Sequence, residues 1–438
     1  MGDERRHRPL SEPSGTGWHR EDMAEKTRVL SPRAARRARW AVPSVVAVVV
    51  AGAFVGPALV ANADTDLPDL TPAQLLDKVA AAAPTALSGT AVYTARLGLP
   101  EIPLGEMAGA DPVNLLGGSS TLRVWTDGTE RSRVALLGAT SEYSVVTDGP
   151  EAWTYSSDDE EVVHYALSAA DRARFDALDR QAREGRLPGV HGELPTPQEA
   201  GRDALARAQE HSSVTVTDPT TVAGRAAYQV VVDPKSSTTL VDRVVVAIDA
   251  RTWTPLRVQA WSTSDSGAPA LELGFTDVSF TEPSDSVLSF TPPPGASQRD
   301  VVVPLPTAGD LARAHAQKDA AGALPDGVTV TGTGWDTVVE LSDVDLADLV
   351  AGDPADVAQG FRKTFGSKGA QELYQKWVPS DGEGPVPDLD TAALYDSLTT
   401  PVDGGRVLRS ALLSALVLDD GRVLVGAVPV DVLQDLAR

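Results

Sequence analysis

The 438-residue chain contains no cysteine and few aromatic residues, which make up 5% of the sequence. The absence of cysteine excludes a disulfide framework, a thiol nucleophile, thiolate metal ligands and a lipid-modified N-terminal cysteine. Basic residues are also in the minority, with 38 Lys and Arg against 61 Asp and Glu and a net charge of -23. So acidic a chain lacks the positive surface that nucleic-acid binding requires, and its length allows more than one domain.

The charge is distributed unevenly around one apolar segment. Residues 1–39 contain ten basic and six acidic residues, residues 40–63 contain none, and residues 64–438 contain 28 basic and 55 acidic residues. The uncharged segment from Trp40 to Ala63 has enough residues to cross a hydrocarbon core of about 30 Å. Four arginines precede it directly, Arg33, Arg36, Arg37 and Arg39, which predicts a cytoplasmic leader and an acidic body outside the membrane.

Two interpretations of this segment stay open. The 39-residue leader favours a membrane anchor, whereas the interruptions at Pro43 and Pro57 and the ending Ala61-Asn62-Ala63 are typical of a cleaved signal sequence. The first predicts a single-pass membrane protein with its other domains extracytoplasmic. The second predicts a protein secreted after cleavage at Ala63. A buried core helix is the third reading, but it gives the basic leader no role.

The body begins with a helix and continues with strands. Thr71-Pro72 predicts the N-terminus of a helix that runs to about Ala83. From Ala91 to Leu97 the apolar period changes to 2, which is typical of a half-buried antiparallel strand. The same pattern predicts strands at 122–126, 131–137, 142–147, 152–155 and 162–167, and a second set at 214–217, 227–232, 242–248, 256–261 and 271–280. Between the sets, Thr196-Pro197 predicts a helix that extends through Ala208.

One insertion departs from the strand pattern. The segment from Leu97 to Gly118 is too long for a hairpin loop and too apolar for a solvated one, and loops of this length are usually functional or disordered. We interpret it as a lid over an apolar groove, with a flexible linker and plain core packing as the alternatives. The lid candidates are Leu99, Ile102, Leu104, Leu115 and Leu116.

Five stretches of the body carry a resemblance to a known family. They read TLRVWTDGTERSRVALLG, EYSVVTDGPEAWTYSS, VAGRAAYQVVVDP, RVVVAIDARTWTPLRVQ and FTPPPGA. In their order of strands and turns they resemble the half-barrel domain shared by LolA-type lipoprotein carriers and RseB (MucB) envelope-stress regulators. The resemblance covers roughly residues 70–297 and implies an α+β fold, in which residues 64–300 form a curved, incompletely closed antiparallel sheet with a helical lid.

The rest of the chain, residues 301–438, resembles the smaller C-terminal domain of RseB-like proteins. The stretches LPDGVTVTGTGWDTVVELSDV and GAVPVDVLQDLA, and a hairpin turn at Asp419-Asp420-Gly421, carry this similarity. Between them we expect a helix at Ala355–Phe365 and a loop at Gly382–Pro387.

The half-barrel resemblance implies an apolar concavity that binds acyl chains. A site of this kind needs apolar area more than polar groups, because affinity comes from area removed from water. For each strand residue that we expect to line this concavity, the alternative interpretation is an ordinary core residue of the sheet that contacts no ligand. The candidates are Tyr93, Leu97, Val124, Val134, Leu136, Tyr143, Val145, Trp153, Tyr155, Tyr228, Val230, Val244, Leu256, Val258, Leu273 and Phe275, with Arg123 and Glu142 expected on the opposite face.

Enzymatic chemistry finds little support in the residues. No two of the six histidines have the i, i+4 spacing of a helical metal site, and there is neither a Gly-x-Ser-x-Gly elbow nor a phosphate-binding loop. We interpret His164 as a surface strand residue, and the acidic clusters Asp158–Glu161 and Asp343–Asp348 as solvated turns. The expected protein is therefore not an enzyme and has no cofactor and no metal.

Three functions remain open at this stage. The first is a carrier of lipid or lipoprotein acyl chains outside the membrane. The second, implied by the RseB resemblance, is an envelope sensor that regulates a membrane partner such as an anti-sigma factor. The third is an unrecognised hydrolase. Expected partners are a lipid or lipoprotein acyl chain, that anti-sigma factor or a lipoprotein, and the membrane through the N-terminal segment.

Overall fold

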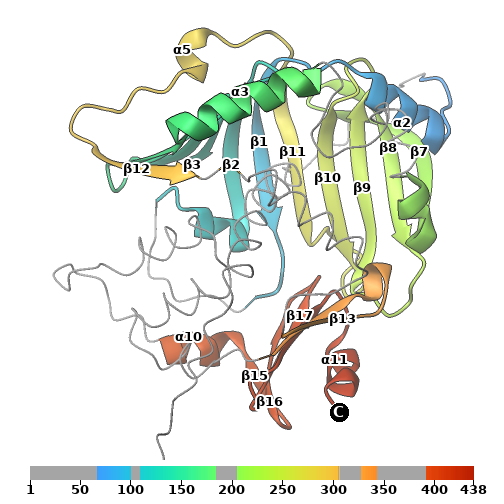
Figure 1. The fold of residues 1–438 in the computed structure, drawn as a ribbon. Coiled ribbons are helices and arrows are strands. Elements are labelled where there is room, and N and C mark those ends of the chain that lie inside the picture. Colours follow the sequence, from blue (N-terminus) through green and yellow to red (C-terminus); the bar gives the residue numbers. More distant parts are fainter. Residues whose placement is uncertain (1–66, 100–108, 184–204, 304, 306–326, 343–390) are drawn as a thin grey trace, which may run out of the picture.

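The computed structural model describes residues 67–99, 109–183, 205–303, 305, 327–342 and 391–438. Within these ranges the chain forms two antiparallel sheets with one parallel edge strand, and a few helices (Figure 1). None of the helices in these ranges is long and apolar enough to span a membrane. The predicted membrane segment 40–63, the helix at 355–365 and the loop at 382–387 lie outside the described residues.

Helix α2 (Pro72–Ala81) begins where the sequence predicts. The hydroxyl of Thr71 accepts a hydrogen bond from the backbone of Gln74, whose side chain in turn accepts one from the backbone of Thr71. This reciprocal capping satisfies two backbone donors that a helix start leaves open. Leu75, which is 2% exposed, packs against Tyr228 and Ile248 of the sheet.

The larger sheet contains 12 strands in the described part of the chain, in the order β12-β6-β5-β4-β3-β2-β1-β11-β10-β9-β8-β7. Its strands are β1 (Leu87–Ala95), β2 (Gly118–Thr126), β3 (Arg131–Leu137), β4 (Glu142–Asp148), β5 (Glu151–Ser156), β6 (Glu161–Leu167), β7 (Ser212–Val222), β8 (Arg225–Pro234), β9 (Val241–Asp249), β10 (Pro255–Ser262), β11 (Leu271–Ser279) and β12 (Ser297–Val303). Two meanders of neighbouring strands therefore meet where β1 pairs with β11.

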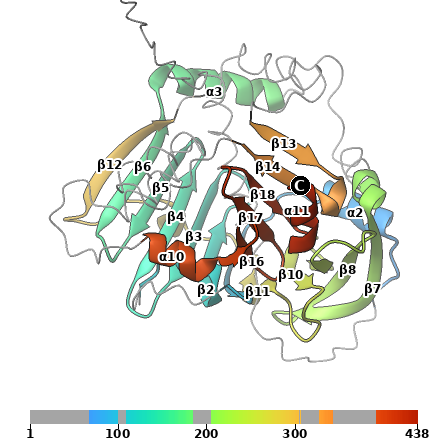
Figure 2. The same cartoon turned by 90° about the horizontal axis from the view of Figure 1, so that it is seen from below.

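The sheet is curved and its two edge strands do not pair. Figure 2 shows the strands from β12 to β7 along an arc, with α3 (Ala169–Arg183) across its open side. In Figure 1, α2 and α3 both lie in front of the strands, so the two helices share one face of the sheet. A large, unclosed sheet with helices on one face is the half-barrel that the sequence predicts, and it is a single sheet rather than a sandwich.

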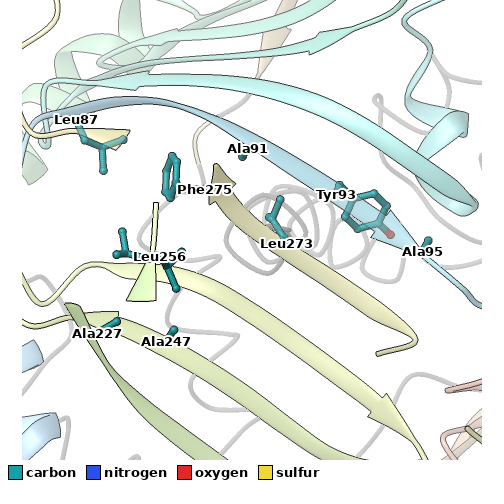
Figure 3. Packing of buried hydrophobic residues seen from close by; sticks show 10 residues of the cluster. Leu87, Ala91, Tyr93, Ala95, Ala227, Ala247, Leu256, Leu273 and Phe275 are labelled. Atoms are coloured by element: carbon teal, nitrogen blue, oxygen red, sulfur yellow. The ribbon is translucent and has the colours of Figure 1, made fainter. Parts of the chain in front are cut away.

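The main core lies where the two meanders join. Ala91, Tyr93 and Ala95 of β1 form one buried cluster with Leu273 and Phe275 of β11. Figure 3 shows Phe275 between Leu87 of β1 and Leu256 of β10. A β-bulge between Thr90 and Ala91 shifts the register here, and such bulges increase local bending. The largest buried cluster of the described residues therefore includes the strands in the middle of the sheet order.

The second sheet has the strand order β13-β14-β18-β17-β16-β15. It consists of β13 (Val328–Thr331), β14 (Val338–Leu341), β15 (Thr400–Val402), β16 (Gly405–Arg409), β17 (Ser414–Leu418) and β18 (Val423–Gly426). Helix α11 (Val430–Leu436) packs on it through Leu433, and α10 (Thr391–Leu398) precedes β15. The predicted turn at Asp419-Asp420-Gly421 joins β17 to β18, with Gly421 at φ 86.

The second sheet touches the large sheet at several places. The amide of Ala411 donates to the carbonyl of Leu97 at 2.7 Å, and the amide of Leu240 donates to the carbonyl of Ala427 at 2.8 Å. A further contact is a 2.9 Å bond from Trp335 Nε1 to the hydroxyl of Ser212. The two sheets are therefore joined by specific hydrogen bonds and not only by the chain.

Most of the predicted strands of the large sheet agree with these bounds, but other elements differ. Strand β12, which pairs in parallel with β6, and helix α3 were not predicted. Residues 205–211 are helical, as the prediction through Ala208 requires, although the predicted start at Thr196 lies outside the described residues. The short helices η1 (Pro112–Leu116), α5 (Asp285–Leu288) and η2 (Gly334–Asp336) complete the described structure.

Candidate functional site

The strand register determines which side chains share a face. Residues that pair directly across neighbouring strands project to the same side, and sides alternate along each strand. Tyr228 packs against α2, so we define the α2 face as the side of the sheet that carries Tyr228 and every residue in register with it.

The register places most of the predicted groove residues on the α2 face. Across β4, β3, β2, β1, β11, β10, β9 and β8, these residues are Tyr143, Val145, Val134, Leu136, Val124, Tyr93, Leu273, Phe275, Val258, Val244, Val230 and Tyr228. Arg123 and Glu142 project to the opposite face, as expected. Leu256 lies in a bulge where the β9–β10 register shifts, and Leu97 lies just beyond the end of β1.

Trp153 and Tyr155 are corrections, because they project to the opposite face. Asp148 pairs with Glu151 across a two-residue turn, which places Val145 opposite Thr154 and Tyr143 opposite Ser156. The large aromatic residues of β5 therefore lie away from the α2 face. Their rings contact Phe290 at 6.1 and 6.2 Å between centroids, in the segment after α5. They lie on the face opposite the α2 face, beside Phe290.

The α2 face of β2, β3 and β4 is ordered in three rows across the strands. The first row, nearest the end of the sheet, contains the hydroxyl side chains of Thr126, Ser132 and Thr147. The second row consists of Val124, Val134 and Val145, which are half-buried. The third row consists of Leu122, Leu136 and Tyr143. Polarity therefore falls from the end of the sheet toward its middle.

An open cavity of about 510 Å³ lies at the hydroxyl row. One wall is the end of α2 and the residues after it, from Val79 to Thr85. The opposite wall is the β2–β3 turn with Thr126, Glu130, Arg131 and Ser132, and Thr252–Pro255 closes a third side. Seven of the 16 lining residues carry a hydroxyl group. The valine row does not line the cavity but follows directly after its hydroxyl residues on the same face.

Trp253 forms part of this rim in an unusual backbone conformation. Its φ of 60 lies in the left-handed region, which bulky residues rarely adopt. Its ring stacks on Tyr228 at 5.8 Å between centroids, and Lys78 of α2 lies 5.0 Å above it. Backbone strain of this kind concentrates at functional sites. Trp253 was not among the residues predicted from the sequence. The only feature of the sequence that could have identified it is the presence of a large aromatic residue within a turn.

The charged groups at the rim are already paired. Asp127 accepts hydrogen bonds from the backbone of Thr129 and of Arg131 and from the Arg131 side chain. Burial would raise the pKa of Asp127, but these bonds outweigh it and lower the pKa to about 2. Arg131 also forms an ion pair of 2.8 Å with Asp285. The guanidinium group at the rim is therefore held by two carboxylates.

His164 is half-buried and paired, whereas the sequence predicted a surface residue. Its Nδ1 lies 2.9 Å from a carboxylate oxygen of Asp300, and its Nε2 lies 3.5 Å from Glu151. Its ring stacks on Trp153 at 5.0 Å. Through His164 of β6, these contacts connect Asp300 of β12 with Trp153 of β5 on the face opposite the α2 face. Across the described ranges no group of three or more His, Asp or Glu side chains could hold a metal ion.

The lid candidates differ in their placement. Leu115, in η1, packs against the main core cluster, whereas Leu116 is 47% exposed. Leu99 is half-buried, and Ile102 and Leu104 lie outside the described residues. Leu97, at the root of the insertion, also packs against the core cluster.

No protein-family model and no curated protein matches the chain. Among solved structures, the Pseudomonas aeruginosa MucA/MucB complex aligns with 83% of this chain and 94% of that chain, at 15% identity and a TM-score of 0.37. A crystal structure of MucB aligns over 61% and 74%, at 19% identity and a TM-score of 0.31. A LolA superfamily protein from Nitrosomonas europaea aligns over 51% and 99%, at 11% identity and a TM-score of 0.19.

The structural neighbours are thus MucB and LolA-superfamily proteins, the two groups that the strand order suggested. All three TM-scores are below 0.5, so the function proposed below depends on the residues of this chain and not on these neighbours.

Proposed function

We propose that the chain is an exported, non-catalytic protein that binds an acyl chain on the α2 face of its large sheet. The observation that carries this proposal is the valine row of Val124, Val134 and Val145, which is half-buried beside an open cavity. Apolar side chains that are only half-buried on the helix-bearing face of a curved sheet leave apolar area for a ligand to cover.

Apolar contact alone is sufficient for useful affinity. Burying an acyl chain of about a dozen methylenes is worth roughly 0.8 kcal/mol for each methylene. Association and ordering subtract several kcal/mol, roughly 4 to 15. At the lower end of that cost a net binding free energy of about 5 to 6 kcal/mol remains, which corresponds to a Kd of roughly 0.1 mM without any charged contact. This is consistent with a groove whose second and third rows contain no charged residue.

The test is photo-cross-linking with a palmitic acid analogue that carries a diazirine, using the full chain in its native membrane. We expect mass spectrometry to map the cross-links to β2, β3 and β4. Val124→Glu should lower the yield by about tenfold or more, because it places a charge in the apolar path. The matched control is Arg123→Glu, which adds a glutamate at the neighbouring, exposed position on the opposite face.

The two variants separate the groove from a general effect of charge. Equal cross-linking of wild type, Val124→Glu and Arg123→Glu would exclude the α2 face as the binding site. Circular dichroism and urea unfolding of each variant establish that the sheet is intact before the yields are compared.

A sensor function is the second candidate, and the junction of the two sheets favours it. Ala411 of the second sheet bonds to the carbonyl of Leu97, and its own carbonyl accepts a 2.6 Å bond from the Ser262 hydroxyl. Ala411 lies in the turn between β16 and β17. Because Leu97 also packs against the core of the large sheet, the β16–β17 hairpin connects the second sheet with the start of the insertion at residues 97–118. In this second candidate function, ligand binding on the large sheet is communicated through the second sheet to a membrane partner, such as the anti-sigma factor partner of MucB-like regulators.

The anchor belongs to the same proposal. Membrane attachment through residues 40–63 suits a sensor, whereas cleavage after Ala63 suits a diffusing carrier. Determination of the mature N-terminus in the native envelope distinguishes the two.

A further inference from the structure

The open cavity at the end of the large sheet has a polarity that restricts the ligand class. We infer that it binds the neutral, hydroxyl-rich head group of a lipid, such as a sugar or polyol, while the acyl chain lies along the valine row. This inference rests on the proposed acyl-binding function and adds the head-group class and the direction of the ligand.

The direction follows from the order of the rows. The cavity is lined by Thr126, Ser132 and Thr147, and the valine row begins two residues further along each of the same strands. Two residues of strand correspond to roughly 6.6 Å, so the polar and apolar rows are immediate neighbours. An amphipathic ligand that satisfies both must place its head at the rim and its chain toward Leu136 and Tyr143.

The head-group class follows from the polar atoms that line the cavity. A hydroxyl group has one donor and two acceptor positions, and Ser132 and Thr147 use only some of theirs in the 2.8 Å bond between them. The rim therefore offers both donors and acceptors at neutral side chains, a set that matches ligand hydroxyl groups. The apolar walls, Val79, Ala82, Pro84 and Trp253, can contact the carbon skeleton of such a group.

A phosphate head group fits the same lining poorly. Phosphate recognition favours several cations or a helix N-terminus. The lining contains one guanidinium, Arg131, which is already paired with Asp127 and Asp285, and one carboxylate, Glu130, which repels an anion. The part of α2 that lines the cavity is its C-terminal end, where the helix dipole disfavours negative charge.

Two probes with the same acyl chain test the inference on the full chain in its native membrane. One is a glucosyl diacylglycerol and the other a phosphatidylglycerol, each with a diazirine at the end of one acyl chain. We expect the glucolipid to cross-link at least about fivefold more than the phospholipid, the effect of one or two additional hydrogen bonds. The label should map to peptides that contain Leu136 or Tyr143.

Variants of the hydroxyl row supply the second measurement. The double variant Ser132→Ala, Thr147→Val keeps the side-chain volume and should reduce the glucolipid preference to about equal labelling, since two hydroxyl groups are lost. Phospholipid labelling should be unchanged. The control Trp153→Ala, on the opposite face, should retain the full preference.

The outcomes separate this inference from the proposed function. Equal or greater labelling by the phospholipid in wild type overturns the head-group assignment and leaves acyl binding standing. A preference that survives the double variant also overturns it. If neither probe labels β2, β3 or β4 above the Val124→Glu background, acyl binding itself fails.

Discussion

The guanidinium of Arg225 holds the carboxylate of Asp249 with two hydrogen bonds, Nε to Oδ2 at 2.5 Å and Nη2 to Oδ1 at 3.0 Å. Asp249 is 1% exposed and ends β9. It also accepts bonds from the backbone of Arg251 and of Thr252 and from the Thr252 hydroxyl. One carboxylate thus fixes both the β7–β8 hairpin and the turn that carries Trp253.

Replacement of this carboxylate should destabilise the fold. Asp249→Ala leaves the Arg225 guanidinium and two backbone donors without their acceptor, and breaking a buried pair in this way costs about 3–5 kcal/mol. Urea unfolding should show the loss as a lower midpoint. The exposed pair Arg438–Asp435 provides the control, because Asp435→Ala should change the midpoint very little. Equal effects of the two variants would contradict a structural role for Asp249.

Acid should remove the stabilisation that Asp127 contributes at the rim of the cavity. The folded-state pKa of Asp127 is lowered from 3.8 to about 2, so its contribution to stability is complete above pH 3.8 and is lost as the pH falls toward 2. Burial also raises the pKa of Asp249, but the bonds from Arg225, Thr252 and Arg251 produce a net lowering, and its contribution changes in the same direction.

The measurement is the urea midpoint of the full chain at a series of pH values below 5. Asp127→Asn should lower the midpoint at neutral pH and flatten its decline between pH 3.8 and about 2. A variant that declines as steeply as wild type in this range would show that Asp127 does not provide the acid sensitivity.

The positions of the strands could be predicted from the sequence, but the pairing of each strand with its neighbours in the sheet could not. Alternation of apolar and polar residues is a local signal, so the strands from β1 to β11 could be located from it. Strand β12 pairs in parallel with β6, more than a hundred residues earlier, and no local pattern encodes such a pairing. Helix α3, with the sequence AADRARFDALDRQAR, has too few apolar residues to show a clear helical stripe.

Part of the candidate site was predictable from the same local alternation of apolar and polar residues. Val124, Val134 and Val145 follow from alternation, because the strand period is fixed. The face of Trp153 depends on the length of the β4–β5 turn, where a shift of one residue reverses every side chain. The rim cavity is assembled from α2, the β2–β3 turn and the turn at Trp253, which only the folded sheet brings together.

The junction of the two sheets should depend on Gly334. A Cβ atom at this position would lie 2.4 Å from Cγ of His211, and its φ of 60 favours glycine. Gly334→Ala should therefore displace the neighbouring Trp335 from Ser212 and cost about 1–3 kcal/mol. Hydrogen exchange should show weaker protection of β13 and β14, while the centre of the large sheet stays protected.

Gly117→Ala is the matched control for this variant, because nothing lies within 4 Å of its added Cβ and its φ is not positive. It should leave exchange at the second sheet unchanged. Unaltered exchange in Gly334→Ala would show that the contact between Trp335 and Ser212 does not hold the two sheets together.

The topology of the chain yields the last prediction. Arg33, Arg36, Arg37 and Arg39 lie directly before the uncharged segment 40–63, and the first basic residue after it is Lys78, so the positive-inside rule places residues 64–438 outside. Protease added to intact protoplasts should digest this body and spare residues 1–39 if the segment remains an anchor. A cleaved signal would instead yield a mature N-terminus at Asp64 and protein released from the membrane. Permeabilised protoplasts, in which the leader must also be digested, are the control. Protection of the acidic body in intact protoplasts would reverse the assigned orientation and remove the basis for acyl binding outside the cell.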